Sequence, residues 1–567
     1  MKNIFTLFLS FIYITSFSQE VQKRDVTAEQ IDAIFSQWDT QTKPGIAVGI
    51  LNDGEIVYTK GYGLANLEHQ IPISSKTRFH IGDIAKEFTV YALLLLEQRG
   101  EFSLQDDIRK YLPKLKSFPY PISIQQLIHH TSGLNNLEVS KALAGWRTED
   151  VFTKEQAYAL ILSQAKSLSI NKNVQRFSDA GFMILEDLIA EVGKVPYADF
   201  VTKHIFEPLE MKNSIFDTEG AVISSKAQGY FAQKDGFVNT TMNQTHTILS
   251  DVYTTVGDMC LWAKELENPK IGTEEMTSKF DALSTVNSSQ IKETNTALYT
   301  GAHRYWNFRG AKKMYHTEVA GGYASKLIRY PDYALAVVIM GNDGAYNGYA
   351  GTGASALYIE DFLDPVPDES EKIVSEKLSK KLLELFEGDY WGIDNHTTRK
   401  IYVANDTLRY SRSKGNESAL LPLSKNSFKM ITWNEVVVNF DSKSNSKTMS
   451  VKVGDNTTKF IAYETDASWT KDLSVFTGKY HAKALNTSYL LVLEEGKLVL
   501  NHSRLEPVQL APRIKNVFTG NQRHFTSLEF KNGTNGNITG FKLSTRGVAD
   551  IWFQKENSSN DTFMKTK

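Results

Sequence analysis

Asp83 and Lys86 are the residues whose types and spacing first suggest chemistry. They lie three residues apart within residues 79–88, just before the apolar run of residues 90–96. So dense an apolar run predicts a buried helix, and residues three apart share one face of it. A carboxylate and an ammonium at the head of a buried helix are costly unless they pair or line a polar cavity. The pair therefore indicates a functional site, or else an aspartate that caps the helix beside a lysine that extends to solvent.

The same stretch resembles the serine β-lactamase and penicillin-binding-protein family, most closely its class C, esterase and D-aminopeptidase branch. Members typically read F-x-I-G-S-x-x-K-x-F-T where this chain has residues 79–89. The resemblance covers roughly residues 27–360 and implies an α+β fold, a β-lactamase-like antiparallel sheet flanked by helices. Further matching segments are residues 100–107, 130–134 (His-Thr-Ser-Gly-Leu), 205–211 and 321–323 (Gly-Gly-Tyr).

The chemistry of that family does not carry over to the matched positions. Asp83 stands where the family has its nucleophilic serine, although the partner Lys86 is kept. In the second motif Phe177 replaces a tyrosine, and in the third Glu318 replaces a glycine. Phenylalanine cannot exchange a proton, Asp83 has no hydroxyl to acylate, and loss of a hydrolase nucleophile costs roughly a millionfold in turnover. Acyl-serine hydrolysis is therefore not expected, and Ser178 is kept as a reserve nucleophile.

The replaced motifs all carry a carboxylate. Since the three motifs converge on one pocket in the family's fold, the resemblance implies that Asp83, Asp179 and Glu318 cluster around Lys86 and His316. Close like charges raise at least one carboxyl pKa, while an ammonium favours ionisation of its nearest neighbour. One protonated and one ionised carboxyl is the arrangement used in general acid/base catalysis, for example of glycoside hydrolysis. Asp179 has a structural alternative as the N-cap of a helix predicted from that residue to Gly193.

The first functional hypothesis is an exported hydrolase that uses carboxylates, with a glycoside or other oligosaccharide as the best guess for its small-molecule substrate. Asp83 would be the base or nucleophile, and Glu318 or Asp179 the acid. Lys86 and His316 would be electrostatic partners, and no cofactor is implied. Aromatic side chains near a polar cluster could stack on sugar rings. The residues expected to bind the substrate are Phe177, Ser178, Trp306 and Tyr323.

Two alternatives stay open. In the first, the chain is a catalytically inactive β-lactamase-like pseudoenzyme that binds peptidoglycan fragments, a peptide or a protein partner through the old cleft. Asp83 and Lys86 would then be an ion pair that holds the pocket shut. In the second, Asp83, Asp179, Glu318 and His316 hold a divalent cation. Lys86 argues against a metal, because its ammonium would compete for the same space.

Composition excludes several classes of partner. A net charge of −2 over 567 residues gives no reason to expect nucleic acid or an anionic membrane surface. Cys260 is the single cysteine, which rules out intramolecular disulfides and thiolate metal clusters and suggests a buried small hydrophobe. Residues 1–18 have the layout of a cleaved signal peptide, and no later segment is apolar for long enough to span a bilayer. We therefore expect a periplasmic or secreted protein, with its oligomeric state left open.

The rest of the chain divides into a β-lactamase-like domain over residues 19–363, a linker with a short helix over 364–384, and two repeated modules over 385–470 and 471–567. The modules show a period of 90, because Phe-x-Gly-x-Tyr at residues 386–390 recurs at 476–480. They resemble the lipocalin-like β-barrel modules appended to many members of this family. Their default role is packing or accessory, with binding of carbohydrate or lipid as the alternative.

Local patterns predict the elements that must position the candidate site. Residues 45–58 predict a β-hairpin with an Asp-Gly turn, and residues 327–340 predict a second hairpin. The continuous apolar run of residues 334–340 is typical of a strand that is covered by helices on both faces. The central helix is expected over residues 84–98.

Overall fold

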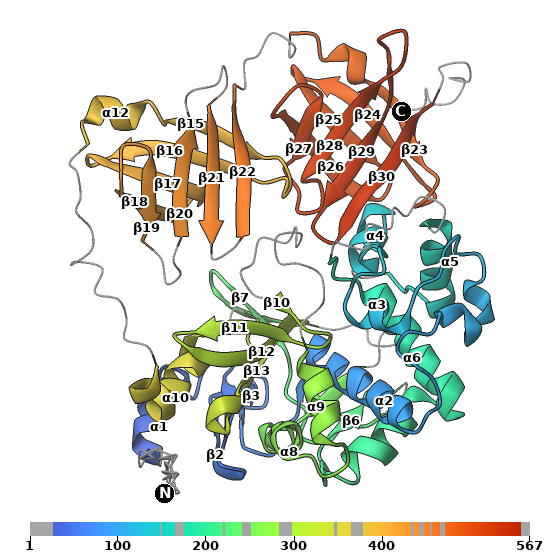
Figure 1. The fold of residues 1–567 in the computed structure, drawn as a ribbon, viewed down its shortest axis with the longest axis vertical. Helices are drawn as coiled ribbons and strands as arrows, with labels where there is room; N and C mark the ends of the chain where they lie inside the picture. Colours follow the sequence, from blue (N-terminus) through green and yellow to red (C-terminus); the bar gives the residue numbers. More distant parts are fainter. Residues whose placement is uncertain are drawn as a thin grey trace, which may run out of the picture.

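Three bodies are visible in the computed structural model: a sheet-and-helix unit and two β-barrels that lie side by side above it (Figure 1). The predicted signal peptide and residues 364–377 of the predicted linker lie outside the described residues. No helix within the described ranges is long and apolar enough to cross a membrane. The structure describes residues 26–147, 150–164, 175–218, 221–240, 251–282, 298–344, 349–363, 378–431, 436–441, 447–453, 456–464 and 471–556.

The first unit contains a seven-stranded antiparallel sheet. The first predicted hairpin is confirmed, because Asp53 and Gly54 both have positive φ, as a two-residue type I′ turn requires. The second predicted hairpin is also confirmed by the pairing of its two strands. In spatial order the strands are β10 (Leu298–Tyr299), β11 (Arg304–Phe308), β12 (Ala311–Ala320), β13 (Tyr323–Tyr330), β14 (Leu335–Gly341), β1 (Ile46–Asn52) and β2 (Glu55–Tyr62).

Helices cover both faces of this sheet, as the continuous apolar strand predicted. Because side chains alternate along a strand, Val337 and Ile339 of β14 join one buried cluster and Val338 and Met340 join the other. The first cluster lies under α1 (Ala28–Phe35) and α10 (Tyr349–Ile359), and the second under α8 (Val256–Glu267). Shorter pairings involve β3 (Leu64–Asn66) with β4 (Ile71–Pro72), β5 (Phe79–His80) and β6 (Ile215–Phe216) with β9 (Val252–Thr254), and β7 (Tyr230–Gln233) with β8 (Gly236–Asn239).

The predicted central helix is present as α2 (Lys86–Gln98), entered through the 3₁₀ turn η2 (Gly82–Ala85). Its first eleven residues are buried, which explains why its apolar run is too dense for a surface helix. The helix predicted from Asp179 is α6 (Asp179–Gly193), which packs against α2. The remaining helices around them are α3 (Ile124–Ile128), α4 (Leu137–Leu143), α5 (Lys154–Gln164), α7 (Tyr197–Val201) and α9 (Glu274–Asp281).

The repeat predicted two modules, and their resemblance to lipocalin-like modules implied β-barrels; both are closed and eight-stranded. The Tyr390 hydroxyl donates to the carbonyl of Phe386 at 2.8 Å, and Tyr480 to that of Phe476 at 2.5 Å, so the repeated motif ties each barrel's entry together. After the short helix α12 (Lys380–Glu384), barrel 1 comprises β15 (Gly388–Gly392), β16 (Thr398–Ala404), β17 (Thr407–Ser413), β18 (Asn416–Pro422), β19 (Ser427–Met430), β20 (Val436–Asp441), β21 (Thr448–Val453) and β22 (Asn456–Tyr463). Barrel 2 comprises β23 (Gly478–Ala482), β24 (Thr487–Glu494), β25 (Lys497–His502), β26 (Leu505–Pro512), β27 (Val517–Gly520), β28 (Ser527–Asn532), β29 (Ile538–Thr545) and β30 (Val548–Lys555).

Barrel 2 is seated on the helices of the first unit, next to α4 and α5 (Figure 1). The Tyr489 hydroxyl donates to the carbonyl of Leu143 at 2.9 Å, and the Ser163 hydroxyl donates to that of Ala484 at 2.6 Å. The buried residues of barrel 2 belong to the same apolar cluster as those of α2 and α6, whereas barrel 1 has a cluster of its own. Barrel 2 is therefore part of the main core.

Replacing Asn342, which follows β14 and is fully buried, should destabilise the sheet unit. Its amide nitrogen donates to three carbonyls, among them those of Leu64 and Gln228, and its amide oxygen accepts from the Gly45 backbone. Asn342→Ala leaves these groups without a partner, at a cost of about 2–4 kcal/mol. Thermal melts should show a lower melting temperature for this variant and an unchanged one for the exposed control Asn416→Ala. Equal melting temperatures for Asn342→Ala and the unmodified protein would show that the hydrogen bonds of Asn342 do not stabilise the sheet unit.

Candidate active site

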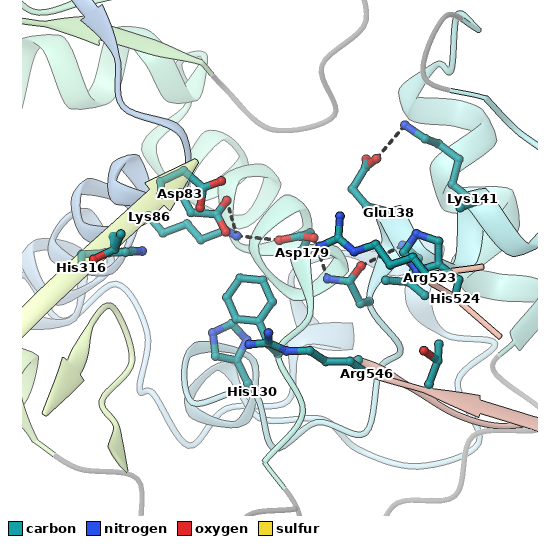
Figure 2. A pocket seen from close by; sticks show the side chains of 18 of the residues that line it. Asp83, Lys86, His130, Glu138, Lys141, Asp179, His316, Arg523, His524 and Arg546 are labelled. Carbon is teal, nitrogen blue, oxygen red and sulfur yellow. Dashed lines mark hydrogen bonds and ion pairs between the residues drawn. The ribbon is translucent and has the colours of Figure 1, made fainter. Parts of the chain in front are cut away.

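A pocket of about 650 Å³ opens where η2, α4, α6, β12 and barrel 2 meet. Asp83, Lys86, Asp179, Glu318 and His316, the five residues predicted to do chemistry, all line it. Segments from distant parts of the sequence therefore converge here as the family resemblance implied. Figure 2 shows Lys86 between the two aspartates, with side chains from barrel 2 extending toward them from the opposite wall.

Lys86 is held between two carboxylates. Its ammonium nitrogen lies 2.7 Å from an oxygen of Asp83 and 2.6 Å from one of Asp179, and the residue is only 5% exposed. The rings of Phe177 and Phe182 flank the ammonium at 4.4 and 5.4 Å from their centroids. Burial alone would lower the pKa of Lys86, but the charges of Asp179 and Asp83 raise it well above its ordinary value. Lys86 is thus a permanent cation here and no proton acceptor.

Asp179 accepts a hydrogen bond from Asn136 in addition to its ion pair with Lys86. It is the first residue of α6 and follows the N-cap position, which Ser178 occupies, so Asp179 is not the N-cap. The side-chain amide of Asn136 donates to its second oxygen at 2.8 Å. Asn136 in turn caps α4 and donates its backbone N–H to the carbonyl of Gly547 in barrel 2 at 2.7 Å. The barrel therefore reaches the acidic cluster through one asparagine.

The three carboxyls have different proton affinities. Burial opposes ionisation of Asp83, but the Lys86 ammonium outweighs it, so the pKa of Asp83 lies below its ordinary value. Burial, reinforced by the charge of Asp83, raises the pKa of Asp179. Burial and the same charge raise the pKa of Glu318 to about 8, so that at neutral pH Glu318 is largely protonated. One ionised and one protonated carboxyl thus line the same pocket.

Gly82 allows the Glu318 side chain to lie close to the turn that carries Asp83. Its φ is +52°, and a Cβ atom there would lie 2.2 Å from Cγ of Glu318. A larger residue would push Glu318 away from the turn that carries Asp83. A glycine before Asp83 therefore brings the two carboxyl groups together.

Two histidines complete the floor of the pocket. Nδ1 of His316 lies 3.5 Å from Glu87, a buried carboxylate that accepts a hydrogen bond from Trp262 Nε1 at 2.7 Å. Nδ1 of His130 accepts from the backbone N–H of Ser178, and burial together with the charge of Lys86 lowers the pKa of His130 to about 3. His130 is thus neutral, with its remaining proton on Nε2.

Three of the four residues predicted to bind substrate lie elsewhere. Ser178 is 1% exposed, does not line the pocket, and donates its hydroxyl to the carbonyl of Asn135 at 3.0 Å. Tyr323 is buried in the core, with its hydroxyl on the carbonyl of Ala227, and Trp306 packs on the sheet next to Phe308. These assignments are corrected. The pairing register places Trp306 on the face of the sheet opposite His316 and Glu318, and Tyr323, although on their face, packs against His80 outside the pocket lining. Phe177 does line it.

The divalent-cation alternative lacks a ligand set. Among the described residues, no group of three or more His, Cys, Asp or Glu side chains is arranged to hold a metal ion. Instead, the Lys86 ammonium occupies the space between the two aspartates. Cys260 is buried, as the sequence suggested.

Several pocket residues were not predicted from the sequence. Asn136 follows the matched segment 130–134 by two positions, and its helix-capping role was a usable signal. Arg523, His524 and Arg546 come from barrel 2, where no local pattern indicates proximity to Asp83. They reach the pocket through the docking of the barrel alone.

Comparison with known proteins agrees with this architecture. The family model described as Beta-lactamase matches residues 31–357, more than half of the chain, and the chain belongs to this family. The putative penicillin-binding protein PbpX of Bacillus subtilis is 31% identical over 170 residues, covering 30% of this chain and 40% of that protein. The teichoic acid D-alanine hydrolase of Staphylococcus aureus is 25% identical over 262 residues, covering 46% of this chain and 61% of that protein. The alignments thus span less than two thirds of these relatives.

A solved structure shares the fold. The octameric penicillin-binding protein homologue from Pyrococcus abyssi has a TM-score of 0.53 and 22% identity, and the match covers 77% of this chain and all of that one. Relatives in the family carry the names of hydrolases, including a D-aminopeptidase of Gluconobacter oxydans that is 25% identical over 53% of this chain and 56% of its own length.

Glu318→Gln should flatten part of the pH dependence of stability. The pKa of Glu318 is about 8 in the folded protein against an ordinary value of 4.5, so the folded state keeps a proton that the unfolded state loses. The stability of the unmodified protein therefore falls as the pH rises from 4.5 to about 8. Below pH 4.5 Glu318 is protonated in both the folded and the unfolded state and contributes no pH dependence. The amide cannot titrate, so thermal melts across this window should decline less steeply for the variant.

Glu138→Gln is the matched control. Glu138 lines the same pocket, but it is 55% exposed and pairs with Lys141 at 2.8 Å. Its replacement should leave the slope unchanged. Parallel slopes for the unmodified protein and both variants would show that Glu318 is ionised at neutral pH.

Proposed function

We propose that this chain is a hydrolase in which Asp83 and Glu318 do acid/base work in place of an acylated serine, and that its substrate is an oligosaccharide. The observation that supports the proposal is the opposite protonation of these carboxyls in one pocket. Enzymes that split a glycosidic acetal bond typically use one carboxyl to give a proton and a second to activate water or act as the nucleophile. The pocket volume of about 650 Å³ suits a small-molecule ligand.

Each residue has a role in this scheme. The protonated Glu318 gives its proton to the oxygen that leaves, while Asp83 takes a proton from the attacking water. Water is thus added across the broken bond, and proton exchange with solvent returns both carboxyls to their starting states. Lys86 keeps Asp83 ionised and also contacts Asp179. Phe177 and Trp146 line the pocket and supply aromatic surface next to the proposed sugar site.

A second candidate function is ligand binding without turnover. The observation that favours it is the saturation of the charged cluster, since Lys86 contacts both aspartates and Asp179 also contacts Asn136. A carboxylate tied to an ammonium at 2.7 Å is a weaker base than a free one. In this case the pocket would recognise saccharide or peptide fragments and release them unchanged.

Asp83→Asn and Glu318→Gln should each lower kcat on any substrate found in an oligosaccharide screen by a factor of about 100 or more. Lys86 still contacts Asp179 in the first variant, so the fold is expected to persist. The exposed Glu101→Gln is the control and should keep full activity. Unchanged kcat in the Asp83→Asn variant would exclude the acid/base scheme, whereas binding without turnover in the unmodified protein would favour the second candidate.

A fluorescent penicillin should leave no covalent label on this protein. Asp83 cannot form a stable acyl ester as serine does, and the hydroxyl of Ser178 is buried on the Asn135 carbonyl. The measurement is in-gel fluorescence after denaturation, with a serine-dependent penicillin-binding protein as the positive control. A labelled band would mean that another hydroxyl acts as nucleophile.

A further inference from the structure

The wall of the pocket opposite Lys86 belongs to barrel 2 and has a single sign of charge. None of the residues that the barrel contributes to the described lining is a carboxylate. We propose that this wall recognises an anionic oxygen group, a carboxylate or a phosphate, on a saccharide ligand of the pocket. The residues are Arg523, His524, Thr526, Thr545, Arg546 and Gly547, from the β27–β28 and β29–β30 connections and the strand ends beside them.

Arg523 and Arg546 have no protein partner within the described part of the chain. Neither Arg523 nor Arg546 makes a hydrogen bond or ion pair there, and both are exposed. Other cations of the same lining are already paired, as Lys141 is with Glu138 at 2.8 Å and Arg147 with Asp150 at 3.4 Å. A guanidinium presents a planar fork of donors that fits carboxylate and phosphate oxygens. Figure 2 shows both arginine side chains extending into the pocket.

The acidic floor does not neutralise this wall. Asp83 and Asp179 are balanced in part by Lys86, Asn136 supplies a further hydrogen bond to Asp179, and Glu318 is largely protonated at neutral pH. The negative charge left on the floor is therefore small compared with that of three free carboxylates. The guanidinium groups remain available to a ligand.

The wall is also fixed in place before a ligand arrives. Arg546 precedes Gly547, whose φ is +78° and whose carbonyl accepts the Asn136 N–H at 2.7 Å. The barrel is further fixed by Arg504, which contacts Asp150 at 2.6 Å. Because these contacts hold the turn that carries Arg546, ligand binding need not order that turn, and less affinity is lost.

The inference rests on the proposed function in one respect: it takes the pocket as the substrate site and names an anionic saccharide as the substrate class. The anionic group would lie at the barrel wall, while the bond to be split lies at Glu318 and Asp83. A neutral saccharide would leave both guanidiniums without an anion and should bind more weakly.

Calorimetric titration of the full chain at low ionic strength tests the inference. The probes are trigalacturonate for the carboxylate, glucose 6-phosphate for the phosphate, and neutral maltotriose. At least one anionic probe should bind tighter than maltotriose, and Arg523→Gln and Arg546→Gln should each weaken its binding roughly tenfold, as expected for one lost charge-assisted hydrogen bond. The anion that responds more identifies the group recognised. Maltotriose binding should not change in either variant.

Lys515→Gln is the control, because it removes a positive charge from an exposed site of the same barrel outside the pocket lining. The inference is overturned if no anionic probe binds tighter than maltotriose, if the arginine variants bind like the unmodified protein, or if Lys515→Gln weakens binding as much. Asp83→Asn separates the two proposals. If the barrel wall recognises the anion, this variant should still bind the anionic probe, whether or not the unmodified protein turns over a substrate. Anion binding without turnover would thus support this inference and count against the acid/base scheme.

Discussion

The structure depends on the buried ammonium of Lys86 and its two aspartates. An unpaired charge in this position would cost several kcal/mol, so α2, α6 and the turn η2 must meet in one arrangement that brings both carboxylates to the nitrogen. The same contacts help to set the protonation of the cluster, because the charge of Lys86 keeps the pKa of Asp83 low, and burial together with the charge of Asp83 raises the pKa of Glu318. One ion triad therefore fixes both the packing of the helices and the chemistry available to the pocket.

Much of the fold was accessible from local sequence patterns. The apolar run after Lys86 predicted a buried helix, and the Asp-Gly pair at residues 53–54 predicted a tight hairpin, because each pattern is read within a dozen residues. The repeat at Phe386 and Phe476 predicted two similar modules, and in both the repeated tyrosine hydrogen-bonds the carbonyl of the repeated phenylalanine. The meeting of Asp83, Asp179 and Glu318 could not come from local patterns and was reached through the family resemblance.

The directions of individual side chains and the docking of barrel 2 could not be predicted from the sequence. Trp306 and Tyr323 lie near the matched motifs, but the register turns Trp306 to the opposite face of the sheet, and Tyr323 packs in the core with its hydroxyl on the Ala227 carbonyl. Ser178 sits between two motif residues, yet its hydroxyl is taken up by a backbone carbonyl. Arg523 and Arg546 are more than three hundred residues from Asp179, and their arrival depends on which face barrel 2 presents. A barrel surface with ordinary composition carries no signal of that choice.

Asn136 links the two halves of the pocket. Its side chain holds Asp179, its backbone N–H holds Gly547, and its side-chain oxygen caps α4. A shift of barrel 2 would therefore disturb the acidic cluster and the arginine wall together, because both depend on the same residue. A cleft made from the sheet-and-helix unit alone would have an acidic floor facing solvent. Lys86 balances part of this charge with or without the barrel, whereas the cationic wall is present only when the barrel is docked. The proposed selectivity for anionic ligands therefore comes from the barrel and the proposed bond cleavage from the floor.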